Sequence, residues 1–145
     1  MMRVLVQEHP FDQSALLDGF GQGSGAVVTF TGLVRGDGGL VALDIEHYPG
    51  MTERALTDHA QAASDRFGLT DALIVHRHGL LRVGEPIMMV ATAARHRRAA
   101  FQAADFLMDW LKSRAPFWKR EIGPGGPGDW VAARDDDEDA LNRWA

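Results

Sequence analysis

The sequence predicts an α+β fold with a largely antiparallel sheet, and two observations lead to this class. Short segments rich in alternating or β-branched apolar residues occur in runs, which is typical of neighbouring antiparallel strands. Two longer segments carry the spacing of amphipathic helices and interrupt those runs. The 145 residues contain no internal repeat or linker-like segment, and a chain of this length can bury a core without disulfides. We therefore expect one domain spanning residues 1–145.

The individual elements follow from local start and stop signals. Asp12 is a candidate N-cap for a short helix, and Thr52 is a candidate N-cap for a longer helix that stops at Gly68. A second long helix begins near Arg95, and Pro116 sets its far limit. The predicted helices are residues 12–20, 52–67 and 95–114, and the predicted strands are residues 3–7, 25–34, 40–48, 71–79, 85–94, 117–122 and 130–135.

Glycine-rich segments separate several of these strands. The turn "RGDGG" lies between segments 25–34 and 40–48, so we expect these two strands to pair as a hairpin. The second of them is a candidate for a small side sheet. "GPGGPGD" near the C-terminus predicts a loop. The acidic run from Asp135 to Asp139 is most simply a solvated stretch of charge.

Composition excludes several classes of function. The net charge of −5 argues against general nucleic-acid binding. The longest apolar run, residues 86–94, is too short to cross a membrane, and the N-terminus lacks the apolar core of a secretory signal. We therefore expect a cytoplasmic protein with no nucleic-acid or membrane partner. The chain has no cysteine, which excludes thiolate metal sites, cysteine nucleophiles and persulfide-bound sulfur.

Cations gather in one part of this acidic chain. From Arg95 to Glu121 there are seven Lys or Arg residues and three Asp or Glu residues, a local balance of +4 that leaves −9 for the remainder. A field of this sign suits an anionic ligand. The sequence "RHRR" falls where a helix begins, although the helix dipole disfavours cations there. His96 and Arg97, together with free backbone N–H groups, would bind a phosphate at this point, and the alternative is that they are solvated surface charges.

The chain's two lysines, Lys112 and Lys119, both lie in this basic region, whereas the other thirteen cationic residues are arginine. A lysine amine can donate or accept a proton, while arginine stays charged. We therefore interpret both lysines as candidate catalytic groups. Two alternatives stay open: Lys112 complements the helix C-terminus or pairs with Asp109, and Lys119 is an exposed strand charge.

The spacing of the basic residues predicts a dimer. His96 and Lys112 are sixteen residues apart, which is about 24 Å along a straight helix. One small ligand cannot easily touch both side chains of the same chain. If both serve one pocket, a second copy of the protein completes it.

Other candidates have weaker sequence signals. Phe30 and Met108 are most simply core residues. Arg35, in the glycine-rich turn, can close over an anion. His76 and His78 share a strand face but lack further ligands at metal spacing, so we expect no metal and no cofactor.

Several stretches of the chain resemble the large, catalytic subunit of molybdopterin synthase. They run in the order of that family and cover roughly residues 25 to 134. The matching stretches are "GAVVTFTGLVR" (25–35), "EHYPGM" (46–51), "HR" (96–97), "FLMDWLKSRAPFWKRE" (106–121) and "WVAAR" (130–134).

The resemblance implies an α/β-hammerhead fold with a small additional β subdomain. It also implies a sulfurtransferase without a cofactor, built as a homodimer that carries a small ubiquitin-like sulfur-carrier subunit at each end, a heterotetramer. The C-terminal Gly-Gly thiocarboxylate of that carrier would enter the pocket. Its sulfur would pass to cyclic pyranopterin monophosphate, and two transfers would form the dithiolene of molybdopterin. The absence of cysteine agrees with sulfur supplied by another molecule.

The resemblance implies a role for each matching residue. Lys112 matches the lysine at the reacting centre, and Lys119 matches a second pocket lysine near the incoming thiocarboxylate. His96 and Arg97 match substrate contacts given by the neighbouring subunit, and Arg35 matches a loop arginine at the pocket mouth. Two groups complete the set: Arg120 and Glu121 continue the binding motif, and Phe30, Met108 and Arg134 match positions near the pocket.

The chain departs from the family pattern at a few positions. Leu33 stands where a lysine is common, the loop after Arg35 is shorter than usual, and Arg95 and Arg98 flank the helix start. Two other functions remain as alternatives. One is a non-catalytic subunit that binds the pterin and the carrier, and the other is a stand-alone phosphate-ester hydrolase.

Overall fold

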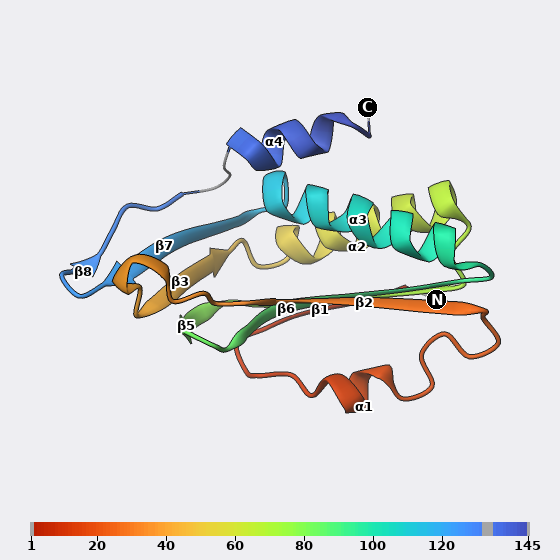
Figure 1. Cartoon of the computed structure of the whole chain (residues 1–145), viewed down its shortest axis with the longest axis horizontal. Helices are drawn as coiled ribbons and strands as arrows, with labels where there is room; N and C mark the ends of the chain where they lie inside the picture. The colour runs from red at the N-terminus through yellow and green to blue at the C-terminus, as the bar shows by residue number, and fades with distance from the viewer. Residues whose placement is uncertain (1, 132–134, 145) are drawn as a thin grey trace.

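The computed structural model describes residues 2–131 and 135–144. Over these residues the strands form two four-stranded sheets, in the orders β1-β4-β6-β2 and β5-β3-β7-β8. Figure 1 shows the second sheet extending as a wing from one end of the first. In chain order the elements are β1 (Met2–Gln7), α1 (Gln13–Leu17), β2 (Ala26–Leu33), the 3₁₀ turn η1 (Asp37–Gly39), β3 (Ala42–His47), α2 (Met51–Phe67), β4 (Asp71–Arg77), β5 (Gly79–Arg82), β6 (Pro86–Ala94), α3 (Arg97–Ser113), β7 (Phe117–Gly123), β8 (Gly126–Pro127) and α4 (Asp135–Asn142).

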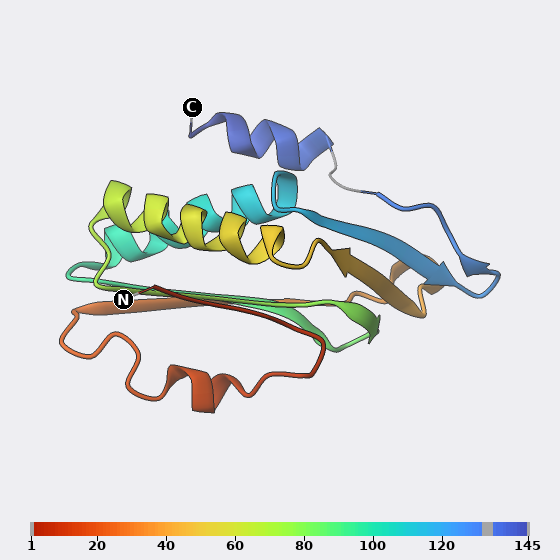
Figure 2. The same cartoon turned by 180° about the vertical axis from the view of Figure 1, so that it is seen from behind.

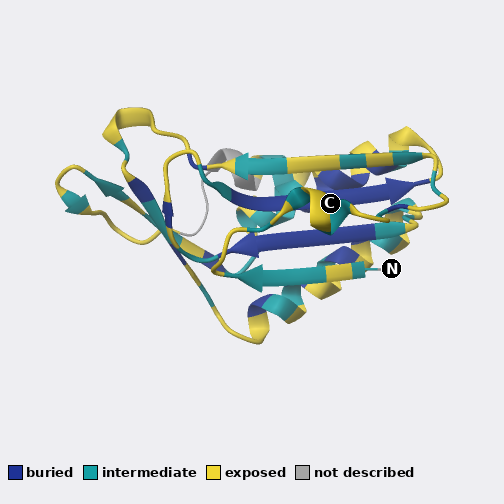
Figure 3. Cartoon of the chain, turned by 90° about the horizontal axis from the view of Figure 1, so that it is seen from below, coloured by how far each residue is buried: buried dark blue, intermediate teal, exposed yellow. Residues whose placement is uncertain are grey.

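The first sheet is covered on both faces. Helices α2 and α3 lie side by side over one face, and α1 with its flanking loops lies under the other (Figures 1 and 2). The two central strands, β4 and β6, are therefore buried almost throughout, as Figure 3 shows from below. Burial on both faces explains why their sequences are continuous apolar runs and not alternating patterns.

The core divides between the two faces of this sheet. Ile74 and Val90 face the helix layer, where they pack with Leu56 of α2 and Leu107 of α3. Met89 belongs to a second, smaller cluster under the opposite face, together with residues of α1 and its flanking loops. This packing fixes the position of α3 on the sheet, and α3 carries part of the predicted basic region.

The structure confirms the α+β class and the mostly antiparallel pairing. In the first sheet only β1 and β4 pair in parallel, counted over the described strands, and the remaining pairs are antiparallel. The second sheet is the predicted small β subdomain. No helix in the described part of the chain is long and apolar enough to cross a membrane.

The predicted hairpin between segments 25–34 and 40–48 is wrong. Strand β2 pairs with β6 in the first sheet, whereas β3 pairs with β5 and β7 in the second. The glycine-rich segment between them carries the chain from one sheet to the other. The Val34 N–H donates to the carbonyl of Glu85, and the Val34 carbonyl accepts from the Gly84 N–H. Val41 donates its N–H to the carbonyl of Ile122. Each strand is therefore held by a partner distant in sequence.

Helix boundaries follow the predicted caps with one correction. Asp12 caps α1 by accepting a hydrogen bond from the Ala15 N–H, and Gly68 ends α2 in the left-handed conformation at φ 67°, as predicted. Thr52 is not the N-cap of α2, because Gly50 occupies that position. The Thr52 hydroxyl instead accepts from the Tyr48 N–H and donates to the Pro116 carbonyl. It thereby ties the start of α2 to the segment that leads into β7.

Two predicted strands have different limits in the structure. The strand predicted at 71–79 ends as β4 at Arg77, and Gly79, at a φ of 93°, bends the chain into β5 of the second sheet, a strand that was not predicted. In segment 130–135, none of the described residues lies in an extended strand. Val131 forms an isolated bridge with Lys119, and Asp135 already begins α4, while residues 132–134 lie outside the described residues.

The C-terminal segment forms α4, and Arg143 and Trp144 after it pack on α3, a contact that the sequence did not predict. Arg143 donates to Asp105 at 2.7 Å and to Asp109 at 2.6 Å. The Trp144 indole N–H donates to Asp109, and its ring meets Phe106 edge-on at 5.4 Å between centroids. The contact is made by the ion pairs of Arg143 with two aspartates and by a single tryptophan, so the polar sequence shows no apolar pattern that would predict it.

Replacing Trp144 with alanine should lower the free energy of unfolding by roughly 1–3 kcal/mol, because the indole buries apolar surface and satisfies Asp109. Urea unfolding followed by circular dichroism measures this. Asn142→Ala, a change at the exposed last residue of α4, is the matched control and should stay within about 0.5 kcal/mol. Equal stabilities for the two variants would show that α4 does not pack on α3 in solution.

Candidate active site

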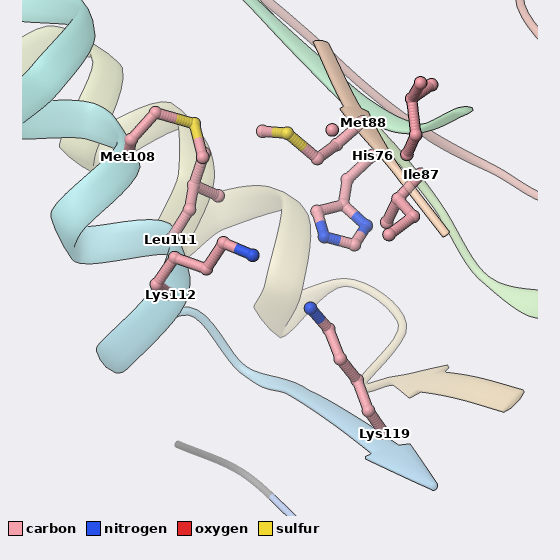
Figure 4. A pocket seen from close by; sticks show the side chains of 9 residues that line it. His76, Ile87, Met88, Met108, Leu111, Lys112 and Lys119 are labelled. Carbon is pink, nitrogen blue, oxygen red and sulfur yellow. The ribbon is translucent and has the colours of Figure 1, made fainter. Parts of the chain in front are cut away.

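A pocket forms where the last turn of α3 meets the ends of β2 and β7. It encloses a cavity of about 40 Å³, and Figure 4 shows the side chains around it. Elements far apart in the sequence converge here because the helix layer, the first sheet and the second sheet all meet at this point. The lining residues are Gly32, Leu33, His76, Ile87, Met88, Met108, Leu111, Lys112 and Lys119.

The two lysines reach this pocket from different elements. Lys112 lies in the last turn of α3, and Lys119 lies on β7 after the Pro116 turn. Their ammonium groups converge from opposite sides of the pocket mouth (Figure 4). Among the described lining residues no side chain is acidic. The wall can therefore attract an anion and offer it several N–H donors. Sequence reasoning singled out both lysines, and the structure brings them together.

His76 is a pocket residue that sequence reasoning did not assign. Its imidazole is 3% exposed and stacks on Phe117, with 3.7 Å between ring centroids. Burial, and then the charge of Lys119, lowers the pKa of His76 to about 3, so the ring is neutral near pH 7. The sequence offered one signal. His76 directly follows the apolar run "ALIV", so a polar residue stands at the end of a segment that is otherwise suited to burial, and this calls for an explanation.

Arg120 and Glu121 do not line this pocket. Arg120 points to the other face of β7 from Lys119, since neighbouring strand residues alternate. Its guanidinium donates twice to Asp44, at 3.1 and 3.3 Å, and lies 4.6 Å from the Trp130 ring centroid. Glu121 lines a second, glycine-rich cavity of about 300 Å³. The residues around that cavity are Asp37, Gly38, Leu40, Glu121, Gly123, Gly126 and Gly128.

Met108, Phe30 and Arg35 lie in three different places. Met108 lines the pocket. Phe30 is 43% exposed and its ring lies close to Gly32, since a Cβ built on that glycine would be 3.7 Å from the ring. Arg35 is exposed and forms an ion pair with Asp37 at 3.5 Å. Arg134 lies outside the described residues.

His96 and Arg97 lie at the opposite end of α3 from the pocket. His96 is the N-cap residue, Arg97 is the first residue of the helix, and both side chains are exposed. Sixteen residues of helix, about 24 Å, separate His96 from Lys112. The structure therefore does not bring these residues together within one chain.

The size of the pocket agrees with an incomplete site. A cavity of about 40 Å³ is far smaller than the roughly 300–1,000 Å³ of pockets that enclose a whole small ligand. It can take the end of a ligand, such as one anionic group, while the rest lies over the open surface or against another chain.

The sequence matches a known protein family over most of its length. Residues 6–114 match the family model described as MoaE protein. A relative from Cereibacter sphaeroides, named molybdopterin synthase catalytic subunit, is 61% identical over 147 residues, covering 99% of this chain and 100% of that one. The Escherichia coli protein of the same name is 50% identical over 124 residues, covering 83% and 81%.

Solved structures give the same result. The molybdopterin biosynthesis MoaE protein from Burkholderia ambifaria has a TM-score of 0.86 at 44% identity, covering 99% of this chain and 98% of that one. A molybdopterin synthase structure from Staphylococcus aureus has a TM-score of 0.80 at 28% identity, covering 88% and 95%. With these matches over nearly its whole length, the chain belongs to the MoaE protein family.

Proposed function

We propose that this chain is the catalytic subunit of a molybdopterin synthase. It would transfer sulfur from the thiocarboxylated C-terminus of a small carrier subunit to cyclic pyranopterin monophosphate. The observation that carries the proposal is the convergence of the two lysines on one pocket, in a chain 61% identical to a relative of that name. The absence of cysteine fits a reaction in which another protein brings the sulfur.

The pocket chemistry suits the two anions of this reaction. A thiocarboxylate is an anion small enough for the cavity between the lysines, and an ammonium group is its natural counter-ion. When the sulfur attacks a substrate carbon, a C–S bond forms and negative charge moves to the displaced oxygen. A lysine ammonium close to that oxygen can stabilise the charge or supply a proton. Water then cleaves the thioester between carrier and product, which frees the carrier as a carboxylate.

The substrate phosphate needs cations outside this small pocket. His96 and Arg97 lie at a helix N-terminus, where backbone N–H groups also favour an anion. Because about 24 Å separates them from Lys112 in the same chain, they would serve the pocket of a second copy. The active unit in this proposal is therefore a homodimer whose two sites each use both protomers, with one carrier bound at each end.

An assay with and without the carrier tests the proposal. The purified chain is incubated with cyclic pyranopterin monophosphate, alone or with thiocarboxylated carrier, and the product is detected by mass spectrometry. We expect a product with two added sulfur atoms only when the thiocarboxylated carrier is present. Carrier ending in an ordinary carboxylate is the matched control and should give none.

The same assay separates the two alternatives. A non-catalytic binding subunit would hold the carrier and the pterin without turnover. A phosphate-ester hydrolase would open the cyclic phosphate with no carrier present. Either result would overturn the proposal.

A further inference from the structure

His76 lies inside the lysine pocket, and none of the roles described above uses it. Its side chain is 3% exposed on the central strand β4. In Figure 4 the imidazole lies between Met88 and the two lysine ammonium groups. The other lining side chains are apolar or are lysine N–H donors. Among the described lining residues, the imidazole is thus the side chain with a nitrogen lone pair to offer.

Two contacts fix the orientation of this ring. Its Nδ1 lies 2.7 Å from the carbonyl oxygen of Arg77, and a carbonyl oxygen can only accept. The proton of the neutral ring is therefore on Nδ1, and Nε2 carries the lone pair. The near-parallel stack on Phe117, at 16° between planes, holds the ring plane. With both contacts made, Nε2 points toward the lysine ammonium groups (Figure 4).

The surroundings keep this ring neutral. Burial is the main cause that lowers the pKa of His76, and the charge of Lys119 is the second. Lys112 and His78 act in the same direction, and only the hydrogen bond to Arg77 opposes them. A protonated His76 would place a third cation against two lysines, so the lone pair on Nε2 remains available.

We propose that His76 is a positioning residue of the pocket, whose Nε2 accepts an N–H from the Lys119 amine and aims that amine at the reacting anion. The inference rests on the proposed function. A lysine amine ends a flexible four-carbon stem with three equivalent donors, so a fixed acceptor restricts where it points. A neutral acceptor does this without cancelling the positive charge that attracts the anion, as a carboxylate would.

A pair of substitutions tests this role against simple packing. His76→Gln keeps an acceptor near the position of Nε2 but cannot stack on Phe117, and His76→Phe keeps the stack but has no acceptor. If His76 positions the amine, His76→Phe should lower kcat by roughly 10- to 100-fold, and His76→Gln should retain most of it. The opposite order, with the phenylalanine variant active and the glutamine variant impaired, would show a packing role and overturn the inference.

The tautomer of wild-type His76 gives a test that needs no turnover. In protein labelled with ¹⁵N-histidine, long-range proton–nitrogen spectra distinguish Nδ1–H, Nε2–H and imidazolium forms. We expect His76 to stay the neutral Nδ1–H form from pH 5 to pH 9, a range that follows from its depressed pKa. An Nε2–H tautomer, or a titration within this range, would overturn the inference even if both variants failed to fold. If wild type makes no dithiolene, the proposed function fails, whereas these spectra judge His76 separately.

Discussion

Replacing Lys112 with alanine is expected to abolish dithiolene formation while leaving the fold intact. The amine lines the pocket from the last turn of α3, but the residue itself is exposed and makes no part of the apolar core. Loss of a positioned proton donor or charge-stabilising group typically costs roughly 10²- to 10⁴-fold in rate. Single-turnover assays with thiocarboxylated carrier measure the rate, and circular dichroism with gel filtration reports on fold and assembly.

Two further variants make this result specific. Arg54→Ala removes an equivalent positive charge from an exposed position on α2 and should leave the rate unchanged. Lys112→Arg keeps the charge but cannot donate a proton at neutral pH, so it separates charge stabilisation from proton transfer. Near-normal product formation by Lys112→Ala, with Arg54→Ala equally active, would remove Lys112 from the reaction.

The sequence was most informative where local chemistry decides the structure. Asp12 and Gly68 marked helix ends correctly because capping depends on a few neighbouring atoms. The two lysines were found by their scarcity, and the Pro116 turn that follows α3 explains how both reach one pocket. None of these inferences required knowing which strands pair.

Errors arose where distant segments decide the outcome. Segments 25–34 and 40–48 resembled a hairpin because a glycine-rich turn joins them, but β2 pairs with β6 and β3 pairs with β7 instead. The sequence placed His76 and His78 on one strand face and gave neither a role. In the structure His76 stacks on Phe117, and the His78 ring lies tilted against His47. Neither neighbour lies close in sequence, so no local pattern could have indicated the contact.

Arg120 illustrates the limit of carrying roles along a motif. It follows Lys119 directly, and the two were predicted to share a ligand. Strand alternation places their side chains on opposite faces, and Arg120 holds Asp44 of the neighbouring strand. A substrate contact for Arg120 stays a prediction, and the ion pair is what the structure contains.

Mixing two inactive variants should restore activity if each site uses both protomers. In a dimer of one His96→Ala chain and one Lys112→Ala chain, one site carries both defects. The other site combines the intact Lys112 of the first chain with the intact His96 of the second. A heterodimer purified through two different affinity tags should therefore recover about half of the wild-type activity, as two-fold symmetry requires. Each parent homodimer should remain inactive, because every one of its sites lacks a group.

The matched control for this experiment pairs Lys112→Ala with Lys119→Ala. Both lysines line the pocket of the same chain, so each site in this heterodimer lacks one of them. No activity should return, and this separates true sharing from a general gain in stability on mixing. If the His96 and Lys112 pair also fails to recover while its subunits exchange normally, the two ends of α3 do not serve a common site. The roughly 24 Å between them would then leave His96 without a role at the pocket of either protomer.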